Sequence, residues 1–368
     1  MRVSVIGGGM IVIDQILPSL DYLRRQGVVS DIEVCARRPA TLEALAAARP
    51  DMPFRPRLEP YAQVLAELPR RQLAVIALPD QTHFDAVMRA LQADQHVLCV
   101  KPLVRTLEES HLIEAEAAKR GLMVAVEYHK RFDDRALMAR QRFRKGQFGE
   151  FRLGTAILFE PWLYRDSNFQ NWFTKEETDA FTYIGCHYVD LVAFMTGLKP
   201  VSVSVVGIAD KFPNGHEGWL WTDARVVWSN GACLNVQNAL GYPDHGPGPN
   251  TQGLTMWCDR SFLRHSDQYR GLEYCTLDGL YKQPSPDYMQ MVETINGGVR
   301  PVGYGFRSIE AIAQTVIDLE AGRTTLALVD AQGLIATPGN SRYNEAVVEA
   351  GRRSIAQGGV TVACADLE

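Results

Sequence analysis

The sequence predicts an α/β protein with a doubly wound parallel sheet in its amino-terminal part and an α+β domain with a large, mostly antiparallel open sheet after it. Over the first 130 residues, short apolar runs alternate with helical patterns, as βαβ units require. From about residue 201 onward, strand-like runs follow one another, which is typical of antiparallel pairing. A chain of 368 residues is long for one domain. We therefore expect two domains, at residues 1–130 and 131–368.

The first 26 residues have the order strand, glycine turn and helix. Residues 2–6 are apolar, glycines occupy 7–9, and apolar residues recur with helical spacing over 11–26. Glycine lets the backbone approach a pyrophosphate, whose charge is stabilised by free N–H groups at the helix start. This order opens a dinucleotide-binding Rossmann unit, although Val12 replaces the usual third glycine. The residues expected to contact the cofactor here are Gly7, Gly9, Met10 and Ile11.

The second strand ends in two arginines. An NAD-binding unit usually places an acid here, to hold the ribose hydroxyls. This chain has Ala36, Arg37 and Arg38 instead. Two guanidinium groups suit a 2′-phosphate, so we expect NADP(H) in preference to NAD(H). The alternative is that one arginine stacks on adenine or faces solvent. Thr41 is expected to cap the helix that follows.

Lysine ends a buried strand further along the chain. The apolar run 97–100 leads directly into Lys101 and Pro102, and proline cannot donate to a ladder. Ligands of open α/β sheets bind at the carboxyl ends of strands, so Lys101 is placed to hold a substrate oxygen. Taken alone, such a lysine would more simply extend to solvent. Other elements expected in this half are strands at 73–78 and 122–126, and helices at 84–93 and 106–120, the last capped by Thr106 with Glu109 and stopped by Gly121.

Four motifs occur in the order and at the spacings of a known family. They are the glycine turn at 7–10, Leu-Pro-Asp-Gln-Thr-His at 78–83, Val-Lys-Pro at 100–102 and Tyr-His-Lys-Arg-Phe-Asp at 128–133. The sequence resembles the glucose–fructose oxidoreductase / inositol dehydrogenase / MocA (Gfo/Idh/MocA) family. In that family the lysine motif is usually Glu-Lys-Pro, so Val100 replaces an acid near the nicotinamide. By this resemblance the cofactor site also includes Leu78, Pro79, His83, Val100 and Lys101.

A second functional segment lies at residues 183–192. His187 and Asp190 are spaced to share one helical face. A lone histidine there is more often a core residue, and no third ligand at useful spacing suggests a metal, so none is expected. The resemblance implies that His187 is the family's catalytic histidine, with Tyr183 where an aspartate is usual. Tyr183 either donates a hydrogen bond or relays a proton, or it only fills space and His187 works alone. Catalytic roles are thus expected for Lys101, His187 and Tyr183, and substrate contacts for His129, Arg131, Asp190 and Trp172.

The rest of the second half is strand-rich. Asn230 and Gly231 form a strong hairpin signal. Residues 241–250 are either a substrate lid or a plain loop. Arg165 and Arg264 are expected to face solvent, and the alternative is that they meet a phosphate or carboxylate. By resemblance, the open sheet packs against another subunit, giving a dimer or tetramer. Strands are expected at 151–159, 201–206, 223–228, 232–239, 253–259, 260–263 and 272–277, and helices at 132–145, 308–322 and 344–355. The tail after Gly358 is either an added strand or a frayed end.

Composition narrows the class of protein. The chain is 46% hydrophobic and 22% charged, as in globular proteins, and its net charge of −5 argues against nucleic-acid binding. No apolar run approaches the about 18 residues of a membrane span. A strand begins at residue 2, which leaves no room for a signal peptide. Seven cysteines are scattered without a CxxC pair, which fits reduced thiols and a cytoplasmic location.

We therefore expect an NAD(P)-dependent oxidoreductase that acts on a secondary alcohol or ketone of a sugar, polyol or sugar derivative. One alternative is an NAD-dependent glycoside hydrolase that oxidises its substrate transiently. Another is a catalytically inactive dinucleotide-binding sensor, because Val100 and Tyr183 both depart from the family's pattern.

Overall fold

The computed structural model describes residues 1–266 and 272–364, and the chain folds into two compact units. The first consists of Met1–Phe132 and Tyr288–Arg342, and the second of Asp133–Asp287 and Tyr343–Glu368. This division differs from two contiguous domains that meet at residue 130. The difference arises because a late helix supplies part of the first unit's core.

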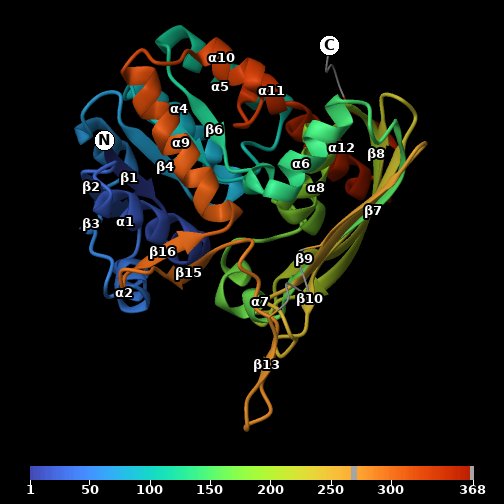
Figure 1. Ribbon diagram of the computed structural model, residues 1–368, viewed down its shortest axis with the longest axis horizontal. Helices are drawn as coiled ribbons and strands as arrows, with labels where there is room; N and C mark the ends of the chain where they lie inside the picture. Colours follow the sequence, from blue (N-terminus) through green and yellow to red (C-terminus); the bar gives the residue numbers. More distant parts are fainter. Residues whose placement is uncertain (267–271, 365–368) are drawn as a thin grey trace. The chain divides into compact units, whose positions relative to one another are not determined.

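The first unit contains a six-stranded parallel sheet in the order β3-β2-β1-β4-β5-β6. This order confirms the doubly wound α/β architecture (Figure 1). Edge strand β3 was not predicted, because its Arg-Pro-Arg sequence lacks an apolar run. The strands are β1 (Arg2–Ile6), β2 (Asp31–Cys35), β3 (Arg55–Arg57), β4 (Leu73–Ile76), β5 (His96–Cys99) and β6 (Val124–Val126).

Helix α9 (Tyr304–Glu320) completes the core of the first unit. Its Ile309, Ile312 and Val316 are buried in one cluster with residues of β1, β5 and α1. Its Phe306 ring also contacts Tyr22 of α1, edge to face, at 5.5 Å between centroids. The other helices of this unit are α1 (Leu17–Arg25), α2 (Pro39–Ala48), α3 (Tyr61–Glu67), α4 (His83–Gln92), α5 (Leu107–Arg120), α10 (Leu326–Gln332) and α11 (Pro338–Ser341), and a small hairpin pairs β15 (Gln290–Glu293) with β16 (Val299–Val302).

Helix ends test the predicted caps. Thr106 is the N-cap of α5 and its side chain accepts from the N–H of Glu109 at 3.2 Å, while Gly121 ends the helix with φ 64°. Both expectations are confirmed. Thr41 lies inside α2 rather than at its cap, so that prediction was wrong. Pro39, whose fixed φ suits the first helical position, starts the helix two residues earlier.

The second unit is built on a seven-stranded sheet in the order β12-β11-β7-β10-β9-β8-β17. Only the β7–β10 pair of this described sheet is parallel, so the expected mostly antiparallel open sheet is confirmed. Gly231, with φ 81°, forms the turn between β9 and β10. The strands are β7 (Phe151–Pro161), β8 (Pro200–Lys211), β9 (Glu217–Trp228), β10 (Cys233–Tyr242), β11 (Thr251–Cys258), β12 (Phe262–Ser266) and β17 (Val362–Ala363).

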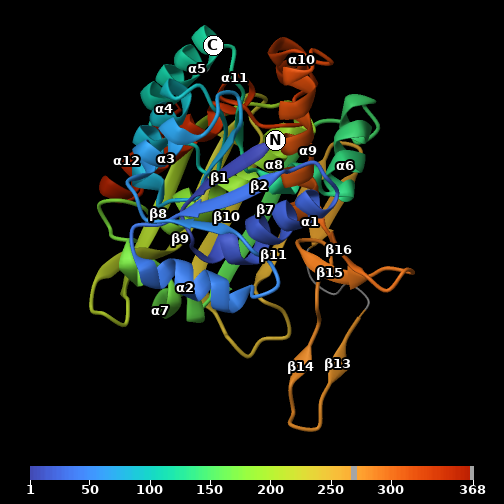
Figure 2. The same cartoon turned by 90° about the vertical axis from the view of Figure 1, so that its left-hand side faces the viewer.

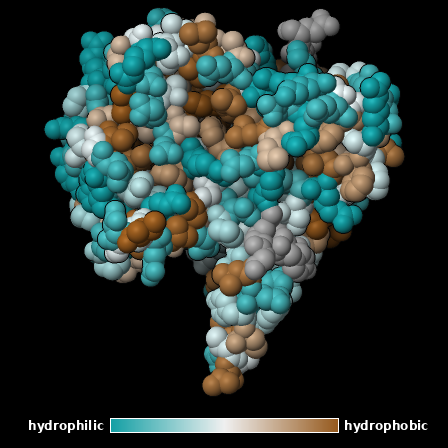
Figure 3. Space-filling model, in the orientation of Figure 1, coloured by the Kyte–Doolittle hydropathy of each residue, from teal (hydrophilic) through white to brown (hydrophobic). Residues whose placement is uncertain are grey.

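Residues 272–277 do not join this sheet. They contribute β13 (Tyr274–Cys275), which pairs only with β14 (Tyr281–Lys282) as a separate two-stranded hairpin that stands away from the large sheet (Figure 2). Leu277 between these strands is fully exposed, and Figure 3 shows apolar atoms at the end of the hairpin.

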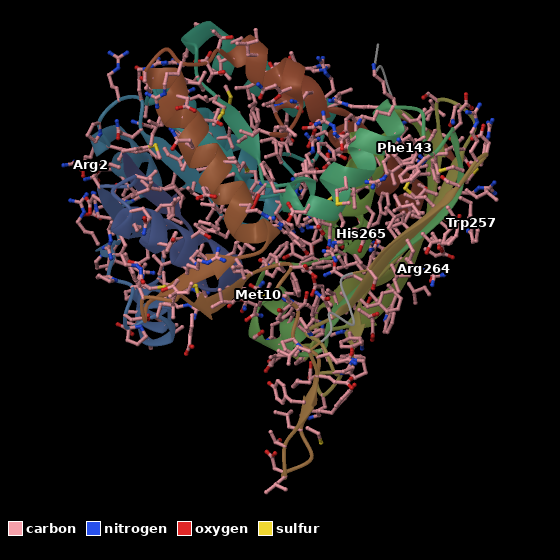
Figure 4. All side chains as sticks on the ribbon, viewed as in Figure 1. Arg2, Met10, Phe143, Trp257, Arg264 and His265 are labelled. Carbon is pink, nitrogen blue, oxygen red and sulfur yellow. The ribbon has the colours of Figure 1, made fainter. Side chains whose placement is uncertain are left out.

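One face of the large sheet is covered by helices, and the other is open. The covered face packs against α6 (Asp134–Arg144), α8 (Cys186–Thr196) and α12 (Tyr343–Ala356) around one hydrophobic core. On the open face, Trp257 and Arg264 point to solvent, while His265 lies on the covered side (Figure 4). No helix in the described part of the chain is long and apolar enough to cross a membrane.

Candidate active site

The glycine turn after β1 is required by a close approach of two strands. Gly7 has φ 116°, and its N–H donates to the carbonyl of Cys35 at 2.8 Å. A Cβ on Gly7 would lie 2.0 Å from the carbonyl oxygen of Ala77. Only glycine fits there without moving β1 and β4 apart.

Close packing does not require a glycine at position 9, in contrast to Gly7. A Cβ on Gly9 would meet nothing within 4 Å among the described residues. Over residues 1–266 and 272–364, the N–H groups of Gly9, Met10 and Ile11 donate to no protein acceptor, while the Gly9 carbonyl accepts from Val12 and Ile13. The turn therefore presents free backbone donors beside open space, as a pyrophosphate cradle does. A π-helical segment η1 (Val12–Ile16), not an α-helix, follows it.

Arg37 and Arg38 are both exposed at the end of β2. Arg38 is the N-cap residue of α2, so both arginines are placed at the start of a helix. Helix N-termini favour anions, and paired guanidinium groups add bidentate donors. This corner of the first unit therefore suits a phosphate.

Lys101 follows β5 and is partly exposed, and its peptide bond to Pro102 is cis. His83 holds this turn in place. Its Nδ1 lies 2.8 Å from the carbonyl oxygen of Pro102 and its Nε2 2.8 Å from that of Leu78. Because His83 is buried and faces these carbonyls, its geometry is that of a brace between two loops. Leu78, Pro79 and Val100, at the same edge of the sheet, are partly exposed.

The segment η3 (His129–Phe132) lies close to Lys101. Burial, together with the charges of Lys130 and Lys101, lowers the pKa of His129 well below its usual value. Lys101 and His129 follow the carboxyl ends of β5 and β6, which are neighbouring parallel strands. The rings of Tyr288 and Tyr304 each lie 5.3 Å from that ring, centroid to centroid. The structure thus brings the predicted residues Lys101 and His129 together.

Arg131 is buried behind this segment. Its Nη1 donates to the Oδ1 of Asn340 at 3.4 Å, and its guanidinium lies 6.0 Å from the Tyr128 ring. These contacts give Arg131 a structural role in joining η3 to α11.

Sequence reasoning missed Glu127, which is buried at the end of β6. Its Oε1 accepts a hydrogen bond from the Oγ of Ser308 at 2.6 Å and another from the amide of Gln15. An acid directly after an apolar strand, at the edge where ligands bind, was a signal that could have identified it.

In the second unit, His187 and Tyr183 belong to consecutive helical segments. Tyr183 lies in the π-helical turn η5 (Phe181–Gly185), and His187, which is buried, in α8. A Cβ on Gly185 would lie 2.4 Å from the Oδ1 of Asn238, so glycine lets this turn approach β10. The Tyr183 ring lies 5.6 Å from Trp172 between centroids, which brings these two predicted residues together.

Asp190 connects two helices. Its Oδ1 accepts from the hydroxyl of Tyr343 at 3.0 Å and from the amide of Asn344 at 2.9 Å, and Asp190 is buried. At least this oxygen of Asp190 fastens α12 to α8.

Arg165 does not face solvent, so that expectation was wrong. It is 2% exposed, pairs with Asp210 at 2.7 Å, and its guanidinium carbon lies 3.4 Å from the centroid of the Trp162 ring. Stacking and the ion pair compensate for its burial. Arg264 is exposed, as expected.

Two family models match the chain. Residues 1–128 match an oxidoreductase family with an NAD-binding Rossmann fold, and residues 136–247 match the GFO/IDH/MocA C-terminal domain.

Characterised relatives share part of the chain. D-glucoside 3-dehydrogenase of Escherichia coli is 27% identical over 206 residues, which cover 55% of each chain. The NADP(+) scyllo-inositol 2-dehydrogenase of Bacillus subtilis is 26% identical over 40% of this chain and 43% of its own. The chain thus spans about half the length of these curated relatives.

Solved structures share the whole fold. GenD2 from gentamicin A biosynthesis, in complex with NAD, has a TM-score of 0.74 at 18% identity and covers 99% of this chain and 96% of its own. Myo-inositol 2-dehydrogenase from Lactobacillus plantarum has a TM-score of 0.73 at 17% identity, with 99% of both chains covered.

Proposed function

Because this chain belongs to the Gfo/Idh/MocA oxidoreductase family, we propose that it transfers a hydride between a nicotinamide cofactor and a secondary alcohol or ketone of a sugar, polyol or sugar derivative. The observation that carries this proposal is the edge of the parallel sheet in the first unit. There the free N–H groups of the glycine turn and the partly exposed Lys101 follow the carboxyl ends of β1 and β5, two strands of the same parallel sheet that are separated by β4.

The proposed roles follow from the chemistry of the side chains. Lys101 donates a hydrogen bond to the substrate oxygen and stabilises the negative charge that develops there. His187 takes the hydroxyl proton, because imidazole titrates near neutral pH, and Tyr183 assists it. The cofactor, when bound, supplies the hydride chemistry. His129, Arg131, Trp172 and Asp190 orient the substrate or the residues that hold it.

We propose NADP(H) as the preferred cofactor. The support is the pair Arg37 and Arg38, both exposed at the end of β2 where an acid would hold the ribose of NAD. A doubly charged 2′-phosphate gains charge-assisted hydrogen bonds there that a hydroxyl does not.

A homo-oligomer is proposed from the open face of the large sheet. Leu153, Trp257 and Phe262 are neighbours across β7, β11 and β12 and are each more than half exposed. Contiguous apolar patches of this kind usually mark an interface. A cytoplasmic location is proposed from the seven cysteines, all of which are free thiols.

The test is turnover with purified protein, NADP and NAD over a panel of sugars and polyols. Lys101→Ala is expected to lower kcat at least about a hundredfold, as loss of a transition-state hydrogen bond does, with NADPH affinity changed little. Lys119→Ala, which removes an exposed lysine of α5, is the control and keeps full activity. Retention of most activity in Lys101→Ala would contradict the role of Lys101. Elimination of an aglycone without net change in NADPH absorbance would indicate the glycosidase alternative instead.

A further inference from the structure

Glu127 stands beside the position where the family's acid is missing. Strands β5 and β6 are parallel, with Cys99 in register with Val126, and the N–H of Glu127 donates to the carbonyl of Cys99 at 2.8 Å. Glu127 is therefore the neighbour of Val100 one strand over. Adjacent strands lie about 4.8 Å apart, and residues in register point to the same face of a sheet.

The face shared by these two residues is the one that carries the cofactor turn. Val100 packs against the same hydrophobic cluster as Ile11 and Ile13, which follow the glycine turn. Glu127 accepts from Gln15 of η1, so its carboxylate also reaches this helix. A carboxylate at 127 thus occupies the side of the sheet to which a glutamate at 100 would point.

The carboxylate of Glu127 is held at one oxygen only. Oε1 accepts from Gln15 and from Ser308, and Gln15 is itself fixed by the carbonyl of Gly305 at 3.0 Å and the hydroxyl of Tyr288 at 2.8 Å. Oε2 is buried with no hydrogen-bond partner in the described part of the chain. An ionised carboxylate so placed is costly unless a positive charge compensates it.

We infer that Glu127 supplies the carboxylate missing at position 100, and that it loses its proton to solvent when a cationic, oxidised nicotinamide binds. Burial raises the pKa of Glu127 to about 7, which outweighs the opposing hydrogen bonds from Ser308 and Gln15. The acid is therefore poised to respond in the neutral range. This inference rests on the proposed function, because that function requires a nicotinamide at this edge of the sheet.

Other titratable groups also face this carboxylate. His129 Nδ1 lies 3.9 Å from Glu127 Oε1, the charges of Lys101 and Lys130 act on His129, and the phenols of Tyr288 and Tyr304 flank its ring. Burial and the charges of Lys130 and Lys101 lower the pKa of His129 well below its usual value, which favours the neutral ring. Glu127 is a positioning residue, because its charge balances that of the cofactor and its hydrogen bonds come from Gln15 and Ser308 rather than from the reacting atoms.

The experiment measures binding of NADP+ and NADPH, without sugar, between pH 6 and 8. Wild type is expected to bind NADP+ up to about tenfold more tightly at the higher pH, as a coupling of one pKa unit gives, with a smaller change for NADPH. Calorimetry in two buffers of different ionisation enthalpy should show release of a fraction of a proton with NADP+. The pH dependence of NADP+ binding and the proton release should both be absent in E127Q. Both should return in the double variant V100E plus E127V, which places the acid at position 100 instead of 127.

The control is D21N. Asp21 is as deeply buried as Glu127 but pairs with Arg24 and Arg25, so D21N tests the loss of a buried acid away from the site. D21N should keep the wild-type pH dependence. An unchanged pH dependence or proton release in E127Q would overturn the inference, as would a folded V100E plus E127V variant that binds both cofactors without pH dependence. If the V100E plus E127V variant does not fold, the pH dependence and proton release of E127Q alone test the inference. Failure of wild type to bind either cofactor would instead refute the proposed function.

Discussion

Gly7 and Gly9 stand two residues apart in one turn, and the structure predicts opposite consequences for the same substitution. In Gly7→Ala the new methyl group would lie 2.0 Å from the Ala77 carbonyl oxygen at a φ of 116°. A positive φ costs a residue with a side chain about 1–2 kcal/mol, and overpacking adds about 1–3 kcal/mol. The free energy of unfolding should fall by about 2–5 kcal/mol, which lowers Tm by about 3–6 °C for a chain of this length.

Gly9→Ala should leave the fold intact and weaken cofactor binding. No described atom lies within 4 Å of the new methyl group, so Tm should change by less than about 2 °C. The methyl group would occupy open space in the turn that carries the free N–H groups. Loss of one charge-assisted hydrogen bond costs about 1.5–3 kcal/mol, or about 10- to 150-fold in NADPH affinity.

The two variants are each other's controls. Thermal unfolding followed by circular dichroism gives Tm, and NADPH fluorescence gives affinity. If Gly9→Ala lowers Tm as much as Gly7→Ala, the steric reasoning is wrong. If Gly9→Ala binds NADPH like wild type, the turn is not the phosphate cradle.

Three further predictions concern other parts of the chain. Replacing Arg37 and Arg38 by alanine should weaken NADPH at least about tenfold and leave NADH unchanged, as binding titrations would show; equal losses for both cofactors would contradict the 2′-phosphate role. His265→Ala should lower the free energy of unfolding by about 3 kcal/mol, because it breaks a buried pair with Asp133 that spans 2.9 Å. Burial raises the pKa of Asp133, but hydrogen bonds from His265 and Arg135 outweigh it and lower that pKa. The stabilisation is therefore present above the pKa of the carboxyl in the unfolded chain and is lost as pH falls through the lower pKa of the folded state. Urea titrations of wild type and His265→Ala should give different free energies of unfolding at pH 7 and similar ones in acid. If the open sheet face forms the proposed homo-oligomer, Trp257→Glu should lower the mass measured by light scattering to that of a monomer, and an unchanged mass would exclude this face as the interface.

Local sequence patterns predicted several helix ends and turns of the fold correctly. The cap at Thr106, the stop at Gly121 and the turn at Gly231 depend on bonds within a few residues, so the sequence alone sufficed to predict them. Strand β3 was not predicted, because an edge strand needs little apolar surface and its charged residues form tertiary ion pairs such as Arg57 with Glu33.

Tertiary partners explain what the sequence could not reveal. Arg165 looked like a surface residue, yet Trp162 and Asp210 compensate for its burial. Asp190 is predicted to contact the substrate, and the structure adds a partner that the local sequence does not reveal, because the hydroxyl of Tyr343, more than 150 residues later, donates to one of its oxygens. Neither pairing is encoded in a local pattern, because the partners meet only after the fold has formed.

The contribution of α9 to the first unit has a consequence for how this protein is made and engineered. Residues 1–132 leave the ribosome long before α9, so the apolar face that Ile309, Ile312 and Val316 cover stays open while the intervening residues are synthesised. A fragment that ends at residue 132 should therefore aggregate or recruit a chaperone. Chimaeras that exchange cofactor domains with another protein should carry residues 288–342 along with the amino-terminal segment, or they will inherit a helix unsuited to the surface it must cover.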